Sequence, residues 1–204
     1  MNINIIKNIP NLKKICLNYI FEDLKIKLNK GELWLEFGVY SGKTINYFAQ
    51  FTDKNVYGFD SFEGLPEAWR PGFKEGKFNK DGLMPDTLPN VKLIKGWFNE
   101  ALEPFLSSTD GLVSFLHLDA DLYSSTKYVL DTLLKQNRIK NGCIILFDEL
   151  LNFPGFLGSK SELRALCEWL EENPNIKWKW IGMNGLVGHT GKMREAACLQ
   201  ILEI

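Results

Sequence analysis

The sequence is poor in the residues that build zinc sites and disulfide frameworks. Its 204 residues include two histidines, His117 and His189, so a histidine-rich zinc site has no support. The four cysteines form no C-x-x-C pair; they are Cys16, Cys143, Cys167 and Cys198. Cysteines spaced so widely are typical of small core residues in a reducing compartment, so we expect a cytoplasmic protein.

Charge of one sign and long apolar runs are also absent. The net charge is −1 and no block of basic residues occurs, so we expect no nucleic-acid partner. No apolar run approaches the roughly 18–20 residues of a membrane span, so we expect no membrane partner. Pro10 and the lysines at 7, 13 and 14 break up the N-terminal region, which therefore makes a poor signal peptide.

What is present suits one globular domain over residues 1–204, because 45% of the residues are hydrophobic and 24% are charged. Apolar positions at helical spacing over 11–28 predict a helical N-terminal extension within 1–30. Further along the chain, strands alternate with helices. The strands are expected at 31–38, 55–60, 91–98, 111–121, 141–150, 175–183 and 195–204, and the helices at 41–51, 99–106, 125–139 and 159–173.

This alternation predicts an α/β fold with a doubly wound, mostly parallel, seven-stranded Rossmann-like sheet. Several strands are continuous apolar runs, as expected when both faces of a sheet are covered. No helix separates the last two strands, so we expect an antiparallel C-terminal hairpin. Residues 64–90 have no clear period and are long for a loop in a compact domain, so they are a candidate lid over the substrate.

Ligands in doubly wound folds bind beyond the carboxyl ends of the strands, and the first such end carries an unusual acid. The stretch LEFGVYSGKT holds Glu36, Gly38, Ser41 and Gly42 just before a helix. A P-loop is excluded, because Phe37 stands where its first glycine belongs. A carboxylate repels a phosphate and suits an ammonium group. The alternative is a strand-to-helix turn eased by glycine.

Two more strand ends carry candidate ligand contacts. Asp60 closes the second strand, where an acid usually binds ribose hydroxyls, although a turn or capping aspartate would look the same. After the third strand, Gly96 and Trp97 lie where an adenine could stack, and equally where core residues could pack.

The fourth and fifth strands end in acids. If these strands are neighbours, Asp119, Asp148 and Glu149 converge at one rim, and three oxygen ligands suit Mg²⁺. Alternatively, the last two cap the following loop. Asp121 is expected to cap the helix at 123–137, because a helix N-terminus favours a negative side chain. His117 is expected in the core.

Taken together, these residues resemble class I S-adenosylmethionine-dependent methyltransferases, and more narrowly the macrocin/mycinamicin O-methyltransferase group, which acts on sugar hydroxyls. The stretches that carry the resemblance are LEFGVYSGKT, VYGFDSFEGLPEAW, LIKGWFNEALEPFL, LHLDADLYSSTKYVL and GCIILFDEL, which lie in order between residues 33 and 150. Residues 1–30 and 151–204 match only in outline.

The resemblance implies a role for each residue. Glu36 would face the ammonium of S-adenosylmethionine, with Gly38 and Gly42 beneath its amino-acid part and Ser41 at its carboxylate. The other cofactor contacts would be Asp60 and Ser61 at the ribose, Gly96 and Trp97 at the adenine, and Asp119. The metal ligands would be Asp119, Asp148 and Glu149, where many relatives carry aspartate or asparagine at the last position.

The activity implied is Mg²⁺-assisted O-methylation of a hydroxyl on a sugar or other small molecule, in natural product or carbohydrate biosynthesis. Asp119 would also accept the proton, with His189 as a second candidate base. A lysine base has no support, since Leu122 occupies its position in the catechol-type relatives. Three alternatives stay open: a metal-independent methyltransferase, a non-catalytic domain that binds S-adenosylmethionine or its product, and a nucleotide-phosphate enzyme, against which the P-loop spacing and Glu36 argue. Residues 64–90 and the N-terminal helix could also form the surface of a homodimer.

Overall fold

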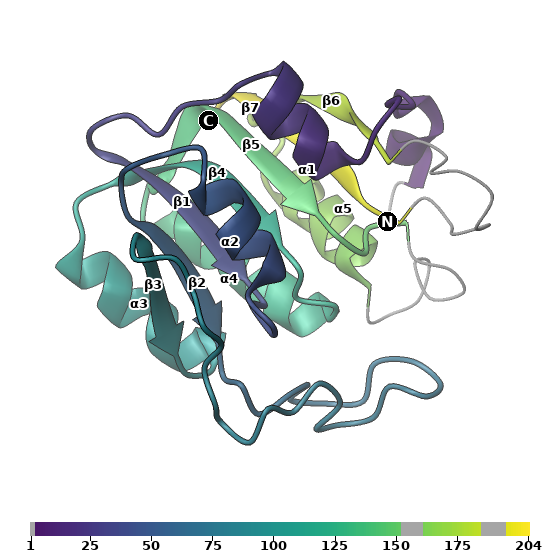
Figure 1. Cartoon of the computed structure of the whole chain (residues 1–204). Helices are drawn as coiled ribbons and strands as arrows, with labels where there is room; N and C mark the ends of the chain where they lie inside the picture. Colours follow the sequence, from purple (N-terminus) through teal and green to yellow (C-terminus); the bar gives the residue numbers. More distant parts are fainter. Residues whose placement is uncertain (1–2, 152–160, 185–194) are drawn as a thin grey trace.

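The computed structural model describes residues 3–151, 161–184 and 195–204 and shows a seven-stranded sheet with helices on both faces (Figure 1). The strand order is β3-β2-β1-β4-β5-β7-β6. The strands are β1 (Glu32–Phe37), β2 (Val56–Asp60), β3 (Val91–Lys95), β4 (Leu112–Leu118), β5 (Ile139–Phe147), β6 (Lys177–Met183) and β7 (Ala197–Glu203). The predicted α/β fold class is confirmed.

Strand pairing brings the carboxyl ends of the first five strands to one edge of the sheet. β1 pairs in parallel with β2 and β4, β2 with β3, and β4 with β5. β7 is antiparallel to both β5 and β6, which confirms the expected C-terminal hairpin and places its second strand between β5 and β6.

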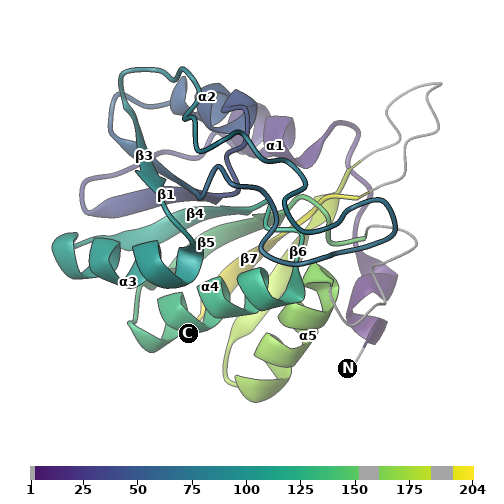
Figure 2. The same cartoon turned by 90° about the horizontal axis from the view of Figure 1, so that it is seen from below.

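The helices form two layers, as Figure 2 shows. α3 (Phe98–Ser108), α4 (Tyr123–Lys135) and α5 (Glu162–Glu172) cover one face, while α1 (Cys16–Asn18) and α2 (Lys43–Ala49) lie on the other. Because successive strand residues point to opposite faces, β1 contributes Leu35 and Phe37 to the first core cluster and Trp34 to the second. The four cysteines are free and buried, as predicted.

The N-terminal helix is shorter than predicted over 11–28. The chain instead forms a 3₁₀ helix η1 (Ile3–Asn8), the single turn α1 and a π-helical turn η2 (Tyr19–Asp23). Between them, the amide of Leu12 donates to the carbonyl of Met183 and the amide of Met183 donates to that of Pro10. Residues 10–12 thus pair with Met183 at the end of β6, and this tertiary pairing overrides the helical pattern of the sequence.

Residues 62–82 form an arm that contains no named helix or strand and is held together by backbone hydrogen bonds. The amides of Lys80 and Gly82 donate to the carbonyl of Phe62, and further out the amide of Leu65 donates to the carbonyl of Lys77. The arm lies at the end of the sheet toward which β1 and β2 point (Figures 1 and 2). Across the described residues, no helix has the length and apolar character needed to cross a membrane.

Candidate functional site

A cavity of about 950 Å³ opens at the carboxyl ends of the strands, beneath the arm. Seven of the residues predicted for the site line it: Gly38, Asp60, Ser61, Trp97, Asp119, Asp148 and Glu149. Four others do not line the cavity but lie within two positions of a lining residue in the sequence: Glu36, Ser41, Gly42 and Gly96. His189 lies outside the described residues. The cavity therefore brings together predicted groups that are far apart in the sequence.

The turn between β1 and α2 is built on left-handed backbone. Gly38, Tyr40 and Gly42 all have positive φ angles, of 93°, 48° and 75°. A side chain on Gly38 would place its Cβ 2.0 Å from the carbonyl oxygen of Asp119, so only glycine fits. Gly42 is the N-cap residue of α2. The turn therefore keeps its backbone close to the end of β4.

Asp60 fixes that same turn from the end of β2. Its Oδ2 accepts hydrogen bonds from the amides of Val39 at 2.9 Å and Tyr40 at 2.7 Å, and its Oδ1 accepts from the amide of Phe62 at 2.7 Å. One carboxylate thus joins the β1–α2 turn to the base of the arm. Carboxylate oxygens have lone pairs left for a further donor, so these bonds are compatible with a hydroxyl ligand.

Beneath the cavity, Glu36 and His117 form a buried pair on adjacent strands. Each is 1% exposed, and His117 Nδ1 lies 2.8 Å from Glu36 Oε1. His117 Nε2 lies 3.9 Å from Asp148 Oδ1, at the cavity rim. Burial lowers the pKa of His117, but the nearby carboxylate of Asp148 and the hydrogen bond and charge of Glu36 outweigh it and raise that pKa well above its ordinary value. His117 is buried, as expected, and these acidic neighbours favour its protonated form.

The acids of β4 and β5 meet at one rim, as the strand order requires. Leu118 pairs with Phe147, and the amide of Asp148 donates to the carbonyl of Leu118. Burial, with the nearby charge of Asp148, raises the pKa of Asp119 well above its ordinary value. Burial and neighbouring acids raise the pKa of Glu149 to about 8. These acids repel one another, which a bound cation would relieve.

The oxygen chemistry of this rim fits a hard cation such as Mg²⁺. The positions of the side chains do not yet form a coordination group: within residues 3–151, 161–184 and 195–204, no three acidic, histidine or cysteine side chains converge as metal ligands. Asp119, Asp148 and Glu149 thus have the right donors without the closed geometry.

Asp121 does not cap α4, so that prediction is wrong. The N-cap residue is Leu122, and no side chain caps the helix. Asp121 instead adopts a left-handed φ of 60°, is 8% exposed and lines the cavity. Burial raises its pKa to about 7, although the charge of Arg70 opposes the shift. A strained, buried acid facing a cavity is a candidate ligand contact that the sequence did not reveal.

Glu162 is a second residue that the sequence analysis missed. Its fully buried side chain, at the start of α5, accepts hydrogen bonds from the amides of Ala120 at 3.3 Å and Glu149 at 3.2 Å. It therefore ties the loop after β4 to the loop after β5. The sequence showed only an acidic residue in the first turn of a predicted helix, and an acidic residue at that position is usually exposed.

At the other end of the cavity, Trp97 and Phe98 line the wall after β3. The ring of Phe98 packs edge-on against Phe37, with centroids 5.1 Å apart. The amide of Gly96 donates to the carbonyl of Asp60 at 3.0 Å, which holds this turn beside the end of β2. The wall offers apolar surface next to the Asp60 carboxylate.

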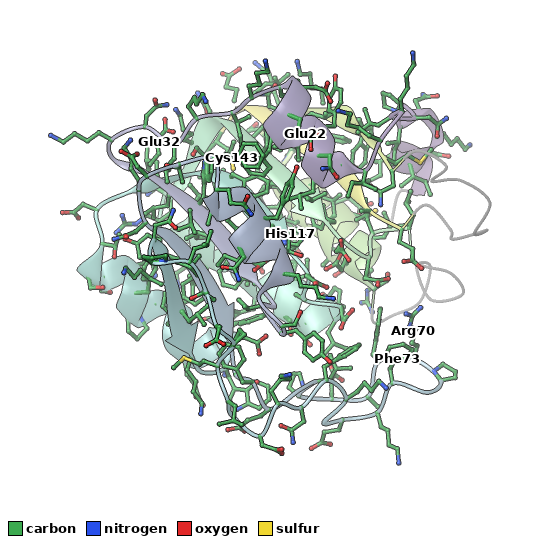
Figure 3. The ribbon with its side chains drawn as sticks, in the orientation of Figure 1. Glu22, Glu32, Arg70, Phe73, His117 and Cys143 are labelled. Atoms are coloured by element: carbon green, nitrogen blue, oxygen red, sulfur yellow. The ribbon has the colours of Figure 1, made fainter. Side chains whose placement is uncertain are left out.

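The outer end of the arm carries a cation between two rings. The Arg70 guanidinium lies 4.1 Å from the Trp69 ring centroid and 4.3 Å from that of Phe73. Figure 3 shows Arg70 and Phe73 together at the end of the arm and His117 inside the fold. Glu67 accepts a hydrogen bond from Ser124 of α4 at 2.8 Å, so the arm is attached to the cavity wall.

A family model described as a methyltransferase domain matches residues 35–150, a little over half of the chain. This segment begins in β1 and ends after β5, so it contains every predicted site residue that lines the cavity. A comparison with curated proteins gives no significant match.

Solved structures with the same fold include three methyltransferases. The calicheamicin methyltransferase CalS11 has a TM-score of 0.60 at 18% identity, over 90% of this chain and 76% of that one. The O-methyltransferase NovP has a TM-score of 0.57 at 19% identity, over 92% of this chain and 77% of that one. MycE, solved with Mg, SAH and Mycinamycin VI, has a TM-score of 0.51 at 16% identity, over 91% of this chain and 48% of that one. At these identities, the likeness concerns the fold.

Proposed function

The chain belongs to the methyltransferase domain family, and from this we propose that it transfers the methyl group of S-adenosylmethionine to a hydroxyl oxygen of a small molecule. The observation that carries the proposal is the cavity at the strand ends, because its predicted lining residues fall inside the matched segment 35–150. We propose a sugar or other natural product as acceptor; the structurally similar CalS11 is a calicheamicin methyltransferase, and MycE belongs to the mycinamycin biosynthetic pathway.

The cavity suits the positively charged cofactor. S-adenosylmethionine would supply a methyl group bound to a cationic sulfonium. Glu36 Oε2 is buried without a hydrogen-bond partner and could accept the cofactor ammonium. Gly38, Ser41 and Gly42 would lie beside the amino-acid part, where left-handed backbone lets a ligand approach.

The nucleoside end would follow the walls after β2 and β3. Asp60 lines the cavity and has lone pairs left for the ribose hydroxyls, with Ser61 beside it. Gly96 and Trp97 would border the adenine, since the Trp97 side offers apolar surface for a flat ring.

At the opposite rim, we propose that Asp119 takes the proton from the acceptor hydroxyl. Its raised pKa makes the carboxylate a stronger base than an exposed aspartate. The acceptor oxygen would then bond to the methyl carbon as the carbon–sulfur bond breaks, with S-adenosylhomocysteine as the leaving product. We keep His189 as a second candidate base. The arm, which lines the cavity with Leu65 and Phe78, would exclude water.

A divalent cation is the finer part of the proposal. Asp119, Asp148 and Glu149 would hold it, and it would lower the pKa of the acceptor hydroxyl. A metal-independent transfer is the second candidate, favoured by the lack of a closed ligand group among the described residues. In that case the same acids orient the acceptor.

Calorimetric titration with S-adenosylmethionine, in Mg²⁺ and in EDTA, tests the cofactor and the metal separately. Micromolar binding in both buffers supports the cofactor site. Cation binding to that complex, lost in Asp148→Asn, supports the metal site. A panel of hydroxylated sugars, followed by detection of S-adenosylhomocysteine, then tests the acceptor. Absence of cofactor binding in either buffer contradicts the proposal.

A further inference from the structure

Beneath the cavity, only one of the two carboxylate oxygens of Glu36 has a hydrogen-bond partner. Oε1 contacts His117 Nδ1 at 2.8 Å, whereas Oε2 is buried and has no hydrogen-bond partner. A buried carboxylate oxygen without a partner costs free energy, so this arrangement suits a ligand that supplies a donor.

His117 determines which way that open oxygen faces. Glu36 and His117 are paired in the register of the adjacent strands β1 and β4, so the imidazole lies beside the carboxylate. The other ring nitrogen, Nε2, lies 3.9 Å from Asp148 Oδ1. The ring is thus hydrogen-bonded to the Glu36 carboxylate at Nδ1 and has a second carboxylate near Nε2, an arrangement that restrains both partners of the hydrogen bond.

Neither side chain lines the cavity, but their neighbours do. Gly38 follows Glu36 by two residues, Asp119 follows His117 by two, and both line the cavity, as does Asp148. Of the pair, Glu36 has the buried oxygen without a partner, so a ligand that reaches the pair would meet Glu36, and His117 would act through it.

We propose that His117 is a positioning residue that orients Glu36 so that Oε2 receives the ammonium of the cofactor. This inference rests on the proposed function, because it assumes that S-adenosylmethionine is the cofactor. It assigns His117 a role in binding the amino-acid part of the cofactor and none at its nucleoside part.

The test compares two ligands in calorimetric titrations. S-adenosylhomocysteine carries the amino-acid part, and 5′-methylthioadenosine lacks it. His117→Leu removes both contacts, and His117→Gln places an amide near Nε2 only. Both are expected to weaken S-adenosylhomocysteine binding about tenfold or more, the value of one hydrogen bond to a charged group, and to leave methylthioadenosine binding unchanged.

Two further variants separate positioning from a general structural role. His117→Asn places an amide near Nδ1, so it is expected to restore most of the affinity. Combining Glu36→Gln with His117→Leu is expected to cost no more than Glu36→Gln alone, since both act on one contact. Ser114→Ala, on the same strand and away from the cavity, is the matched control, and thermal unfolding monitors the fold.

The outcomes distinguish the inference from the function on which it rests. If the wild-type protein binds neither ligand, the proposed function fails. If it binds both and the His117 variants weaken the two ligands equally, or weaken neither, the positioning role is overturned. Additive losses in the double variant would also overturn it.

Discussion

The carbonyl oxygen of Asp119 lies where a side chain on Gly38 would begin, with only 2.0 Å between that oxygen and an ideal Cβ. The first and fourth strands of the sheet thus end in direct backbone contact. The cavity floor has no room for a side chain at Gly38, because the backbone carbonyl of Asp119 cannot rotate away.

Gly38→Ala is therefore expected to destabilise the protein by about 3 kcal/mol or more and to abolish cofactor binding. Gly31→Ala is the matched control, since Gly31 also has a positive φ, of 77°, but nothing within 4 Å of its Cβ position. It is expected to cost about 1 kcal/mol, the conformational term alone. Urea unfolding measures both, and equal losses would contradict the contact with Asp119.

Asp60→Ala is expected to weaken S-adenosylmethionine binding at least about tenfold, because it removes both the proposed ribose contact and the anchor of the amides of Val39 and Tyr40. Calorimetry measures the affinity. Asp53→Ala, at a side chain that is 93% exposed, is the control and is expected to bind like wild type. Unchanged affinity in Asp60→Ala would remove Asp60 from the cofactor site.

Asp119→Asn is expected to abolish methyl transfer while leaving cofactor affinity nearly unchanged, because it keeps the shape of the side chain and removes the base. Single-turnover formation of S-adenosylhomocysteine measures the first effect, and calorimetry the second. If affinity collapses and Mg²⁺ has no influence, the roles proposed for Asp119 as base and metal ligand are both wrong.

The free energy of unfolding of the ligand-free protein is expected to fall as the pH rises from about 4.5 to about 8. Burial and neighbouring acids raise the pKa of Glu149 from 4.5 to about 8, so the folded state resists an ionisation that the unfolded chain undergoes readily. Stability from this group is complete below pH 4.5 and is lost as the pH passes through 8. Asp121, raised to about 7, acts in the same direction.

Urea unfolding at a series of pH values measures this slope. Glu149→Gln and Asp121→Asn are each expected to flatten it, and Asp53→Asn, at an exposed carboxylate, is expected to leave it unchanged. An identical slope in wild type and Glu149→Gln would show that folding does not raise the pKa of Glu149.

Glu162→Ala is expected to leave the amides of Ala120 and Glu149 without their acceptor and to destabilise the protein by about 1–3 kcal/mol for each amide left buried and unpaired. Hydrogen exchange at these two amides, followed by NMR, is expected to accelerate. Glu162→Gln retains a carbonyl oxygen and is expected to protect one of the two. Unchanged exchange in Glu162→Ala would contradict the bridge between the two loops.

The sequence was sufficient to predict the fold and to name residues that line one cavity, because both follow from the points where apolar strands end. Asp60, Asp119 and Asp148 each follow a strand, and a doubly wound order brings such residues to one edge. Outside residues 11–28, the strands and helices were also predicted correctly in type, with ends that differ by a few residues.

Residues whose roles depend on distant partners were not predictable in this way. Glu162 contacts amides from two other loops, and Asp121 takes a left-handed conformation that a local pattern interprets as a cap. The segment 11–28 has a helical pattern, but its first residues extend along β6. In each case a tertiary contact decides the structure, and a single sequence does not record it.

The position of β7 also has a consequence for biosynthesis. It is the last of the seven strands in chain order, yet it lies between β5 and β6 and pairs with both. Until Ala197–Glu203 has emerged, β6 lacks its neighbouring strand and the edge of β5 is unpaired. The growing chain therefore passes through a stage in which the edge of β5 is open to pairing with other chains.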